Sequence, residues 1–382
     1  MKSNPKDALE DKILLYAHVG RSGGHSVNIV LSEYYNPLEC IHFNESNQAW
    51  KTLRDFGESD FRKLRCVRGH GVYYGIHEYL SAPCTYFSIV RDPVERLISQ
   101  YHVHTTDPTS PMYEKVKGAD MSLLEYQSVY ANQQALQLLG IPQSFHGEVT
   151  QAHQRHARTL LDRDYIGLGC YELYLESVFL LEKALGWDFW VYPSISRSSG
   201  PDKFRGITEE DRRVIGKSNQ FDKFIHQYAG ARVRAELLKL SAEQKEELLF
   251  FQESAHLYQY LTEVLDPGSA VSKRALMGLL QKRELDILVA TDLPSGLEML
   301  GSVKNLITAQ VPREINFQLL WDSSSGVSIS EQILRVPAQQ VKECDFVFVI
   351  PFPGKAPISL NQLQRLGVNR DKIIFAFNPP PI

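Results

Sequence analysis

The stretch that decides the fold is ILLYAHVGRSGGHSVN, residues 13–28. Its first four residues are apolar and are typical of a buried parallel strand. A turn with Gly20, Gly23 and Gly24 follows, where the backbone can bend sharply and approach a ligand closely. Residues 26–35 then read as a helix. Because the start of a helix presents unpaired N–H groups and the positive end of the helix dipole, this stretch predicts a phosphate or sulfate site.

The side chains of this loop also suit an anion. Arg21 supplies a fixed positive charge, and Ser22 and Ser26 supply hydroxyl groups. The loop is not a Walker A sequence, because His25 stands where the second glycine of GxxxxGK[ST] belongs and no lysine follows it. A glycine-rich turn without a ligand is the alternative interpretation of this stretch alone.

A second stretch, CTYFSIVRDPVERLISQYH, supports the ligand (residues 84–102). Its residues 85–90 are apolar, β-branched and aromatic, as in a strand. Arg91 follows the strand directly, Pro93 suits the first turn of a helix, and Ser99 lies farther along that helix. Ligands of open α/β sheets bind outside the carboxyl ends of the strands. We therefore expect two anion-binding features on one rim, for a ligand with two separate anionic groups.

A third stretch lies between these two. Residues 66–70 read as a strand followed by a break, which would place the His70 imidazole at the sheet rim. Arg68 lies two residues earlier and would point to the same face of the strand. His77 comes seven residues after His70 and is a further candidate for the same cleft. A plain surface or core role is the alternative for each of these side chains.

Taken in the order in which they occur along the chain, the three stretches resemble motifs of the PAPS-dependent sulfotransferases. The similarity is to the branch that contains the heparan and dermatan sulfate O-sulfotransferases. Within that branch, the chain resembles a soluble member of bacterial type. Residues 18–26 resemble the family's 5′-phosphosulfate loop, HIPKTGGTS, and residues 88–101 resemble its 3′-phosphate motif. Residues 68–80 are similar to its GH-containing stretch. The resemblance covers about residues 12–240 and is strongest in the first hundred.

The resemblance implies a co-substrate, a product and residue roles. The donor would be 3′-phosphoadenosine-5′-phosphosulfate, the product 3′,5′-ADP, and no metal would be needed. His70 would be the general base, while Arg91 and Ser99 would hold the 3′-phosphate. Arg21 would contact the leaving-group oxygen, and Arg68 and His77 are weaker candidates for contacts with the substrate. The 5′-phosphosulfate group would be bound by Arg21, Ser22, Gly23, Gly24, His25 and Ser26.

The chain departs from the family loop at several positions. Arg21 replaces the family's lysine, Gly20 its proline, Ser22 its first threonine, and His25 a threonine or serine. Arginine keeps the charge of lysine, but its planar fork has a different reach. The anion site is therefore expected to persist, and the effect of Arg21 on catalytic efficiency is an open question.

Composition narrows the functional classes. The net charge of −4 gives no overall basic field for nucleic acid. The five cysteines are scattered without CxxC spacing, which indicates reduced thiols in a cytoplasmic protein. No apolar run approaches the ~20 residues that span a bilayer. His153 and His156 share a helix face, but no acidic or cysteine partner is near in sequence, so no metal site is predicted.

Three regions are expected along the chain. Residues 1–265 would form a sulfotransferase domain with a P-loop-like parallel sheet flanked by helices, and residues 266–284 a linker beginning at DPGSA. Residues 285–382 would form a smaller α/β domain, since four apolar strand candidates alternate there with helical stretches. The default role of that region is partner binding or dimerisation, and a degenerate second enzyme domain is the alternative. The sequence leaves open whether the protein forms a homodimer.

The expected acceptor is a hydroxyl group, on a glycan or a small molecule. Two alternatives stay open at this point. An ATP-dependent phosphotransferase would need a magnesium-holding acid, for which only Asp92 suggests itself, and a loop lysine. A non-catalytic nucleotide-binding protein would fit the replacement of lysine by Arg21.

Overall fold

The computed structural model divides into two compact units, Met1–Asp188 with Ile195–Lys245, and Phe189–Ser194 with Glu246–Ile382. The structure describes residues 9, 12–44, 52–53, 63–141, 148–187, 206–265, 284–291, 314–320, 346–350 and 373–375. The candidate active site lies in the first unit.

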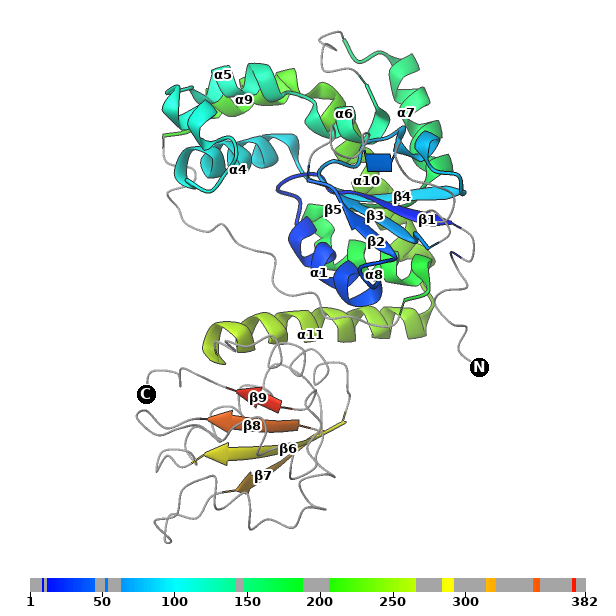
Figure 1. Ribbon diagram of the computed structural model, residues 1–382, viewed down its shortest axis with the longest axis vertical. Helices are drawn as coiled ribbons and strands as arrows, with labels where there is room; N and C mark the ends of the chain where they lie inside the picture. The colour runs from blue at the N-terminus through cyan, green and yellow to red at the C-terminus, as the bar shows by residue number, and fades with distance from the viewer. Residues whose placement is uncertain are drawn as a thin grey trace. The chain divides into compact units, whose positions relative to one another are not determined.

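The first unit is built on a five-stranded parallel sheet with the strand order β2-β3-β1-β4-β5 (Figure 1). The strands are β1 (Ile13–Ala17), β2 (Cys40–His42), β3 (Cys66–Gly69), β4 (Cys84–Val90) and β5 (Tyr165–Cys170). The central strand β1 is fully buried, and its Leu15 pairs with Val67 on one side and Tyr86 on the other. Because β3 and β4 flank β1 in parallel, the loops that follow all three strands leave the sheet at the same edge.

Helices cover both faces of this sheet. The helices of the first unit are α1 (Gly24–Tyr34), α4 (Pro93–Thr106), α5 (Leu123–Tyr130), α6 (Gln133–Leu139), α7 (Gln151–Asp164), α8 (Tyr174–Leu185), α9 (Glu209–Ser218) and α10 (Gln220–Lys239). A further helix, α11 (Ala242–Leu265), begins at the end of this unit and belongs mostly to the second. Short turns of helix lie at η2 (Ile76–Tyr79), η3 (Glu114–Gly118) and η4 (Tyr171–Leu173).

In Figure 1, α1 and α8 lie on one face of the sheet, and α6, α7 and α10 lie on the other. The main hydrophobic core joins strand residues such as Leu15 and Val67 to Leu138 of α6, Leu160 of α7 and Ile225 of α10. Burial of this apolar surface is the main driving force that holds the layers together.

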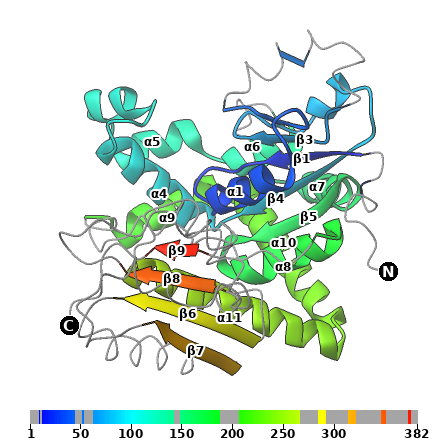
Figure 2. The ribbon, with the colours of Figure 1, turned by 60° about the horizontal axis from the view of Figure 1, so that its bottom comes forward.

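A smaller hydrophobic cluster joins α4, α5 and α9 at one end of the sheet (Figures 1 and 2). It contains Leu97 and Ile98 of α4, Tyr126 of α5 and Ile215 of α9, all fully buried. This cluster fixes α4, and with it Ser99, relative to the carboxyl edge of the sheet.

The local predictions agree with most of these elements. The predicted strands at 13–16, 66–70 and 85–90 correspond to β1, β3 and β4, and the helix predicted at 26–35 begins two residues earlier, at Gly24. The sequence of residues 121–139 has a helical pattern throughout, but the structure divides this stretch into α5 and α6. The break lies at Asn132, whose backbone is left-handed with φ 52 and whose side-chain oxygen accepts hydrogen bonds from the start of α10.

In the second unit, the described residues form a four-stranded parallel sheet with the order β7-β6-β8-β9. Its strands are β6 (Glu284–Thr291), β7 (Glu314–Leu320), β8 (Phe346–Ile350) and β9 (Ile373–Phe375), close to the four predicted strands. The helices predicted between them, and residues 266–283 of the linker, lie outside the described residues. The small α/β domain and the three-region division therefore stay predictions.

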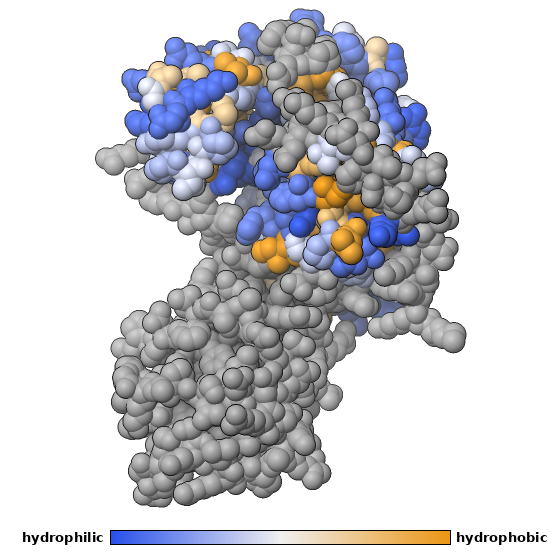
Figure 3. Space-filling view, in the orientation of Figure 1, coloured by the Kyte–Doolittle hydropathy of each residue, from blue (hydrophilic) through white to orange (hydrophobic). Residues whose placement is uncertain are grey.

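The surface of the first unit is mainly polar on the face shown in Figure 3, with hydrophobic side chains in small separate patches. Hydrophilic residues line the recess between the lobe that carries α4 and α5 and the part that carries α1. Within the described part of the chain, no helix combines the length and apolar character needed to cross a bilayer.

Two glycines give a matched test of the packing around α1. A Cβ atom at Gly24 would lie 2.0 Å from the His18 ring and 2.4 Å from the Tyr16 hydroxyl, in a fully packed region. Gly24→Ala should therefore destabilise the fold by about 1–3 kcal/mol. At Gly216 of α9 the one atom that the new methyl group would meet, among the described residues, belongs to the side chain of Val94, at 3.6 Å. Gly216→Ala should stabilise the protein by about 0.4–1 kcal/mol, because alanine loses less entropy in a helix.

Urea-induced unfolding of the wild type and both variants measures these differences. Equal midpoints for the two variants would contradict the packing described for Gly24.

Candidate active site

The loop between β1 and α1 leads into a helix whose N-cap residue is a glycine. Gly23 is the N-cap of α1 and has φ 82, a left-handed conformation that glycine adopts without strain. Within the described part of the chain, no side chain caps α1, and its first turn contains no acidic residue. The first N–H groups of α1 and the positive end of its dipole are thus available to an anion, as the sequence predicted.

The two predicted anion-binding stretches touch each other. The Nε of Arg21 donates a hydrogen bond to Oγ of Ser99 at 3.1 Å, and Nη1 of Arg91 donates to the carbonyl oxygen of Arg21 at 3.0 Å. The Arg21 backbone is left-handed, with φ 68, which is uncommon for a residue with a side chain. The loop after β1, the end of β4 and α4 therefore form one site at the carboxyl edge of the sheet.

The electrostatics of this site favour a bound anion. Burial lowers the pKa of Arg21, and the nearby charge of Arg91 lowers it further. The guanidinium of Arg91 lies 4.4 Å from the centre of the Tyr171 ring, a cation–π distance. Its Nε is buried without a hydrogen-bond partner among the described residues. Two like charges held together, with a buried donor unsatisfied, are a strong indication of an anionic ligand.

The backbone of Arg91 is held rigidly by Gln134 of α6. The Arg91 N–H donates to Oε1 of Gln134 at 2.9 Å, and Nε2 of Gln134 donates to the Arg91 carbonyl oxygen at 2.9 Å. Gln134 is fully buried, so this pair fixes the direction in which Arg91 leaves the sheet. Such preorganisation lowers the entropy cost of binding.

His70 lies next to the same loop and is oriented as a base. Its Nδ1 is 2.8 Å from the carbonyl oxygen of His18, and because a carbonyl only accepts, Nδ1 carries the proton. In the neutral ring Nε2 is then the unprotonated nitrogen. Burial lowers the pKa of His70, and the hydrogen bond to His18 opposes that effect, so the ring is neutral at pH 7. Gly20 is close, since a Cβ there would lie 3.8 Å from Cε1 of His70.

Residues 9–159 match the model of the Sulfotransferase family, and the matched region contains the β1–α1 loop, His70, Arg91 and Ser99. This region, which is less than half of the chain, is similar to the sulfotransferase family. No curated protein matches the chain.

Solved structures also match the chain. One is the crystal structure of the mouse sulfotransferase SULT7A1 complexed with PAP, with 17% sequence identity and a TM-score of 0.26. The match covers 56% of this chain and 66% of the mouse chain, so it spans a little under two thirds of the mouse chain's length.

Within residues 9–159, several loop residues predicted to bind the ligand also shape the loop itself. Oγ of Ser22 donates to the carbonyl oxygen of Val19 at 2.6 Å, and both residues are buried. The Tyr174 hydroxyl donates to the carbonyl oxygen of Gly23 at 3.0 Å, and a Cβ at Gly23 would lie 2.6 Å from the Tyr174 ring. These contacts explain the small residues by packing within the protein, which the sequence could not reveal.

The remaining two residues of the predicted loop site differ in exposure. Ser26 is buried and hydrogen-bonded to Tyr174, and this bond lowers the pKa of Tyr174 against the larger effect of burial, which raises it. His25 is exposed on the first turn of α1.

The structure does not bring Arg68 and His77 into the anion site. Arg68 donates from Nη1 to the carbonyl oxygen of Asn28 and thereby links β3 to α1. Nδ1 of His77 is 2.8 Å from the hydroxyl of Tyr86, and the His77 ring packs against Tyr74. The Tyr74 hydroxyl donates to Asp164, the residue that precedes β5, so His77 lies toward the amino ends of the strands. The expectation that His77 faces the cleft of His70 was wrong.

The sequence analysis missed Tyr171 and Tyr174. Tyr171 follows β5 directly and Tyr174 begins α8 three residues later. The rule that located Arg91, that ligands lie beyond the carboxyl ends of strands, could therefore have found them. Their contacts with Arg91 and Gly23 join residues far apart in the sequence.

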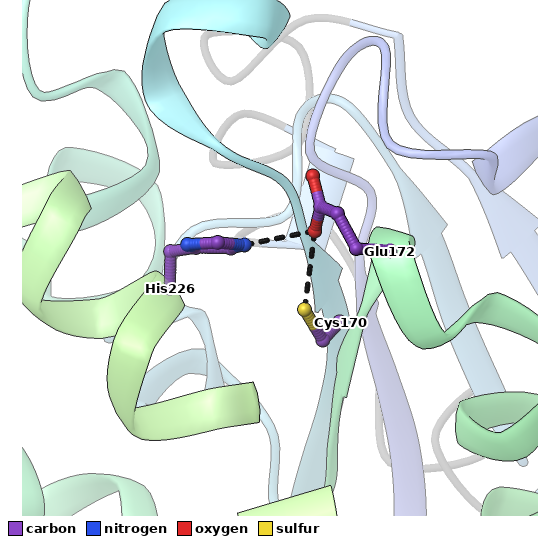
Figure 4. Close-up of side chains that lie close together, drawn as sticks. All are labelled: Cys170, Glu172 and His226. Carbon is purple, nitrogen blue, oxygen red and sulfur yellow. Dashed lines mark hydrogen bonds and ion pairs between the residues drawn. The ribbon is translucent and has the colours of Figure 1, made fainter. Parts of the chain in front are cut away.

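A cluster of Cys170, Glu172 and His226 lies beside the anion site (Figure 4). Oε2 of Glu172 accepts hydrogen bonds from Nε2 of His226 at 2.8 Å and from Sγ of Cys170 at 3.1 Å. Its Oε1 accepts the N–H of Asp92 at 3.0 Å. Burial would raise the pKa of Glu172, but the hydrogen bonds from His226, Asp92 and Cys170 outweigh it and lower the pKa to about 2.

A separate pocket of about 490 Å³ lies beside the edge strand β5, between α8 and α10. Its lining includes Leu168, Leu181 and Arg232 and none of the residues of the anion site.

Proposed function

We propose that this protein transfers the sulfuryl group of 3′-phosphoadenosine-5′-phosphosulfate to an acceptor hydroxyl, on a carbohydrate. The observation that carries the proposal is the direct contact between the two anion-binding stretches, through Arg21 with Ser99 and Arg91 with the Arg21 carbonyl. A donor with phosphate groups at its 3′ and 5′ positions needs two anion sites within one nucleotide's reach. The match of residues 9–159 to the Sulfotransferase family model supports the same donor.

His70 acts as the general base in this proposal. As the acceptor oxygen attacks sulfur, its proton passes to Nε2 of His70, the nitrogen left unprotonated by the bond from Nδ1 to His18. The S–O bond to the 5′-phosphate breaks, and 3′,5′-ADP leaves with the electron pair on that phosphate oxygen. A positioned base contributes about 10²–10⁴ to the rate.

The charge that develops on the departing phosphate is stabilised by Arg21 and by the first N–H groups of α1. Fixed donors of this kind contribute about 10²–10³ each, because they need no reorganisation during the reaction. Arg91 and Ser99 hold the 3′-phosphate, and the Arg91 guanidinium stacks over the Tyr171 ring. Their contribution is to affinity and orientation.

The geometry of Asp92 argues against the phosphotransferase alternative, in which this residue would hold a magnesium ion. Oδ1 of Asp92 accepts the N–H groups of Val94 and Glu95, both at 3.0 Å, and so caps α4. A carboxylate used in this way is committed to the helix terminus.

Calorimetric titration with three nucleotides tests the donor class. The protein should bind 3′,5′-ADP without a metal, bind 5′-AMP more weakly, and show no magnesium-dependent binding of ATP. Transfer of labelled sulfate from the donor to a panel of glycans and small hydroxyl compounds then tests the acceptor class. Tighter binding of magnesium–ATP than of 3′,5′-ADP would overturn the proposal, whereas nucleotide binding without transfer to any acceptor would favour a non-catalytic binding protein.

A further inference from the structure

The cluster of Cys170, Glu172 and His226 has the composition of a transition-metal site. A thiol, a carboxylate and an imidazole from three different elements converge, at the end of β5, in η4 and in α10 (Figure 4). Zinc, which is borderline soft, accepts all three donor types. Magnesium and calcium prefer oxygen ligands alone and do not suit this set.

The distances in the cluster suit a single small ion. The three candidate ligand atoms all lie within 4.8 Å of one another, and the two contacts to Oε2 of Glu172 measure 2.8 and 3.1 Å. With bonds of about 2.0 Å to nitrogen and oxygen and about 2.3 Å to sulfur, tetrahedral zinc separates its ligand atoms by roughly 3.3–3.6 Å. An opening of about half an ångström, within the reach of side-chain rotation, would admit the ion.

The supporting contacts hold two of the three ligands in place. Oγ of Ser177 accepts the N–H of Cys170 at 2.9 Å and donates to its carbonyl oxygen at 3.1 Å, which fixes the backbone that carries the thiol. The Asp92 N–H holds the second oxygen of Glu172. Such contacts behind the ligands are the usual means by which proteins orient a metal site.

Access is also suitable. The Cys170 side chain is buried, whereas 41% of the Glu172 side chain and 20% of the His226 side chain are exposed. An ion can therefore enter from solvent, and a water molecule can complete the coordination.

We propose that Cys170, Glu172 and His226 form a three-ligand site for zinc or a similar divalent transition metal. The metal fastens α10 to the carboxyl end of β5. Because Glu172 also holds Asp92, the N-cap of α4, the metal braces the start of the helix that carries Ser99. Metal binding to these three residues does not depend on the proposed sulfuryl transfer.

The sequence analysis predicted no metal site. The histidine pair of the sequence, His153 and His156, lies on α7 and supplies none of the three ligand atoms. Glu172 and His226 are 54 residues apart, so no sequence spacing could pair them.

Cobalt titration of the chelator-treated full chain tests the proposal. Co²⁺ should produce a thiolate-to-cobalt charge-transfer band that saturates at one ion per chain. Zn²⁺ should displace the cobalt, since zinc binds such ligands more tightly. Zinc should also raise the Tm of the wild type, because it binds the folded state.

Variants assign the band to this cluster. Cys170→Ser, which preserves the size of the side chain, should abolish the band, and His226→Gln should weaken cobalt binding by at least about 100-fold. Cys84→Ser is the matched control, a half-buried thiol outside the cluster, and should leave the band unchanged. Circular dichroism checks that each variant is folded.

Two results would overturn the proposal. Absence of a thiolate band in the wild type would leave the cluster as a hydrogen-bonded ion pair. A band that persists in a folded Cys170→Ser variant would assign the metal to another thiol. If Cys170→Ser fails to fold, unchanged cobalt affinity in His226→Gln would overturn it equally.

Discussion

Replacement of His70 by asparagine should lower kcat by about 10²–10⁴-fold and leave the Kd for 3′,5′-ADP unchanged. The asparagine amide can still donate to the carbonyl oxygen of His18, where Nδ1 of His70 donates now, so the local structure is preserved. What the variant lacks is the unprotonated Nε2 that takes the proton of the acceptor. Single-turnover transfer of labelled sulfate, together with calorimetric binding of 3′,5′-ADP, separates the two quantities.

His156→Ala is the control for this variant. His156 is exposed on α7 and outside the site, so its removal should leave both quantities unchanged. Full activity in a folded His70→Asn protein would remove His70 from the mechanism.

The pH dependence of the wild type gives an independent test of the same base. The base acts in its unprotonated form, and burial lowers its pKa below the usual 6.5. We therefore expect kcat/KM to be constant above about pH 7 and to fall with decreasing pH through a pKa below about 6.5. The acidic limb should be absent from the residual activity of His70→Asn. A limb centred above pH 7 would contradict the assignment.

Arg91→Ala should abolish the preference of the protein for 3′,5′-ADP over 5′-AMP. A hydrogen bond to a charged group contributes about 1.5–3 kcal/mol, which corresponds to a roughly 10- to 150-fold change in Kd per bond. The loss should fall on 3′,5′-ADP alone, because only this nucleotide carries the phosphate that Arg91 is proposed to hold. Calorimetric Kd values for the two nucleotides, in wild type and variant, measure the ratio.

Two further variants sharpen this test. Arg91→Lys keeps the charge but loses the planar fork, so it should recover only part of the preference. Arg213→Ala removes an exposed arginine of α9 that pairs with Glu210, and it should leave the ratio unchanged. An equal loss of affinity for both nucleotides in Arg91→Ala would instead indicate that Arg91 acts by holding the Arg21 loop, through its bond to the Arg21 carbonyl.

Local features of the fold were readable from residues close in sequence. The apolar run at 13–16 and the glycines after it predicted β1 and the turn into α1, and Pro93 marked the first turn of α4. Thr208, followed by three acidic residues, has the local pattern of a helix start, and it caps α9 in a capping box with Asp211. Each of these depends on neighbours within about four residues, where periodicity, capping and the fixed φ of proline act.

Other features depended on contacts that local patterns do not specify. Arg68 was expected at the rim beside His70, but the structure ties it to the Asn28 carbonyl of α1. The rings of Tyr171 and Tyr174 reach the site because β5 lies next to β4, and no periodicity in either strand specifies that neighbour.

The sequence by itself determined that two stretches predicted to bind anions follow two buried strands, and that a histidine follows a third. Only the tertiary structure decided that these strands are neighbours, in the order β3-β1-β4, so that Arg21 contacts Ser99 and His70 lies beside the glycine-rich loop. It also brought Cys170 and Glu172 to His226 across 54 or more residues. The physical reason is that strand order and the packing of α10 are set by burial of apolar surface between distant segments. A pattern of neighbouring residues records which face is buried but not against which segment it packs.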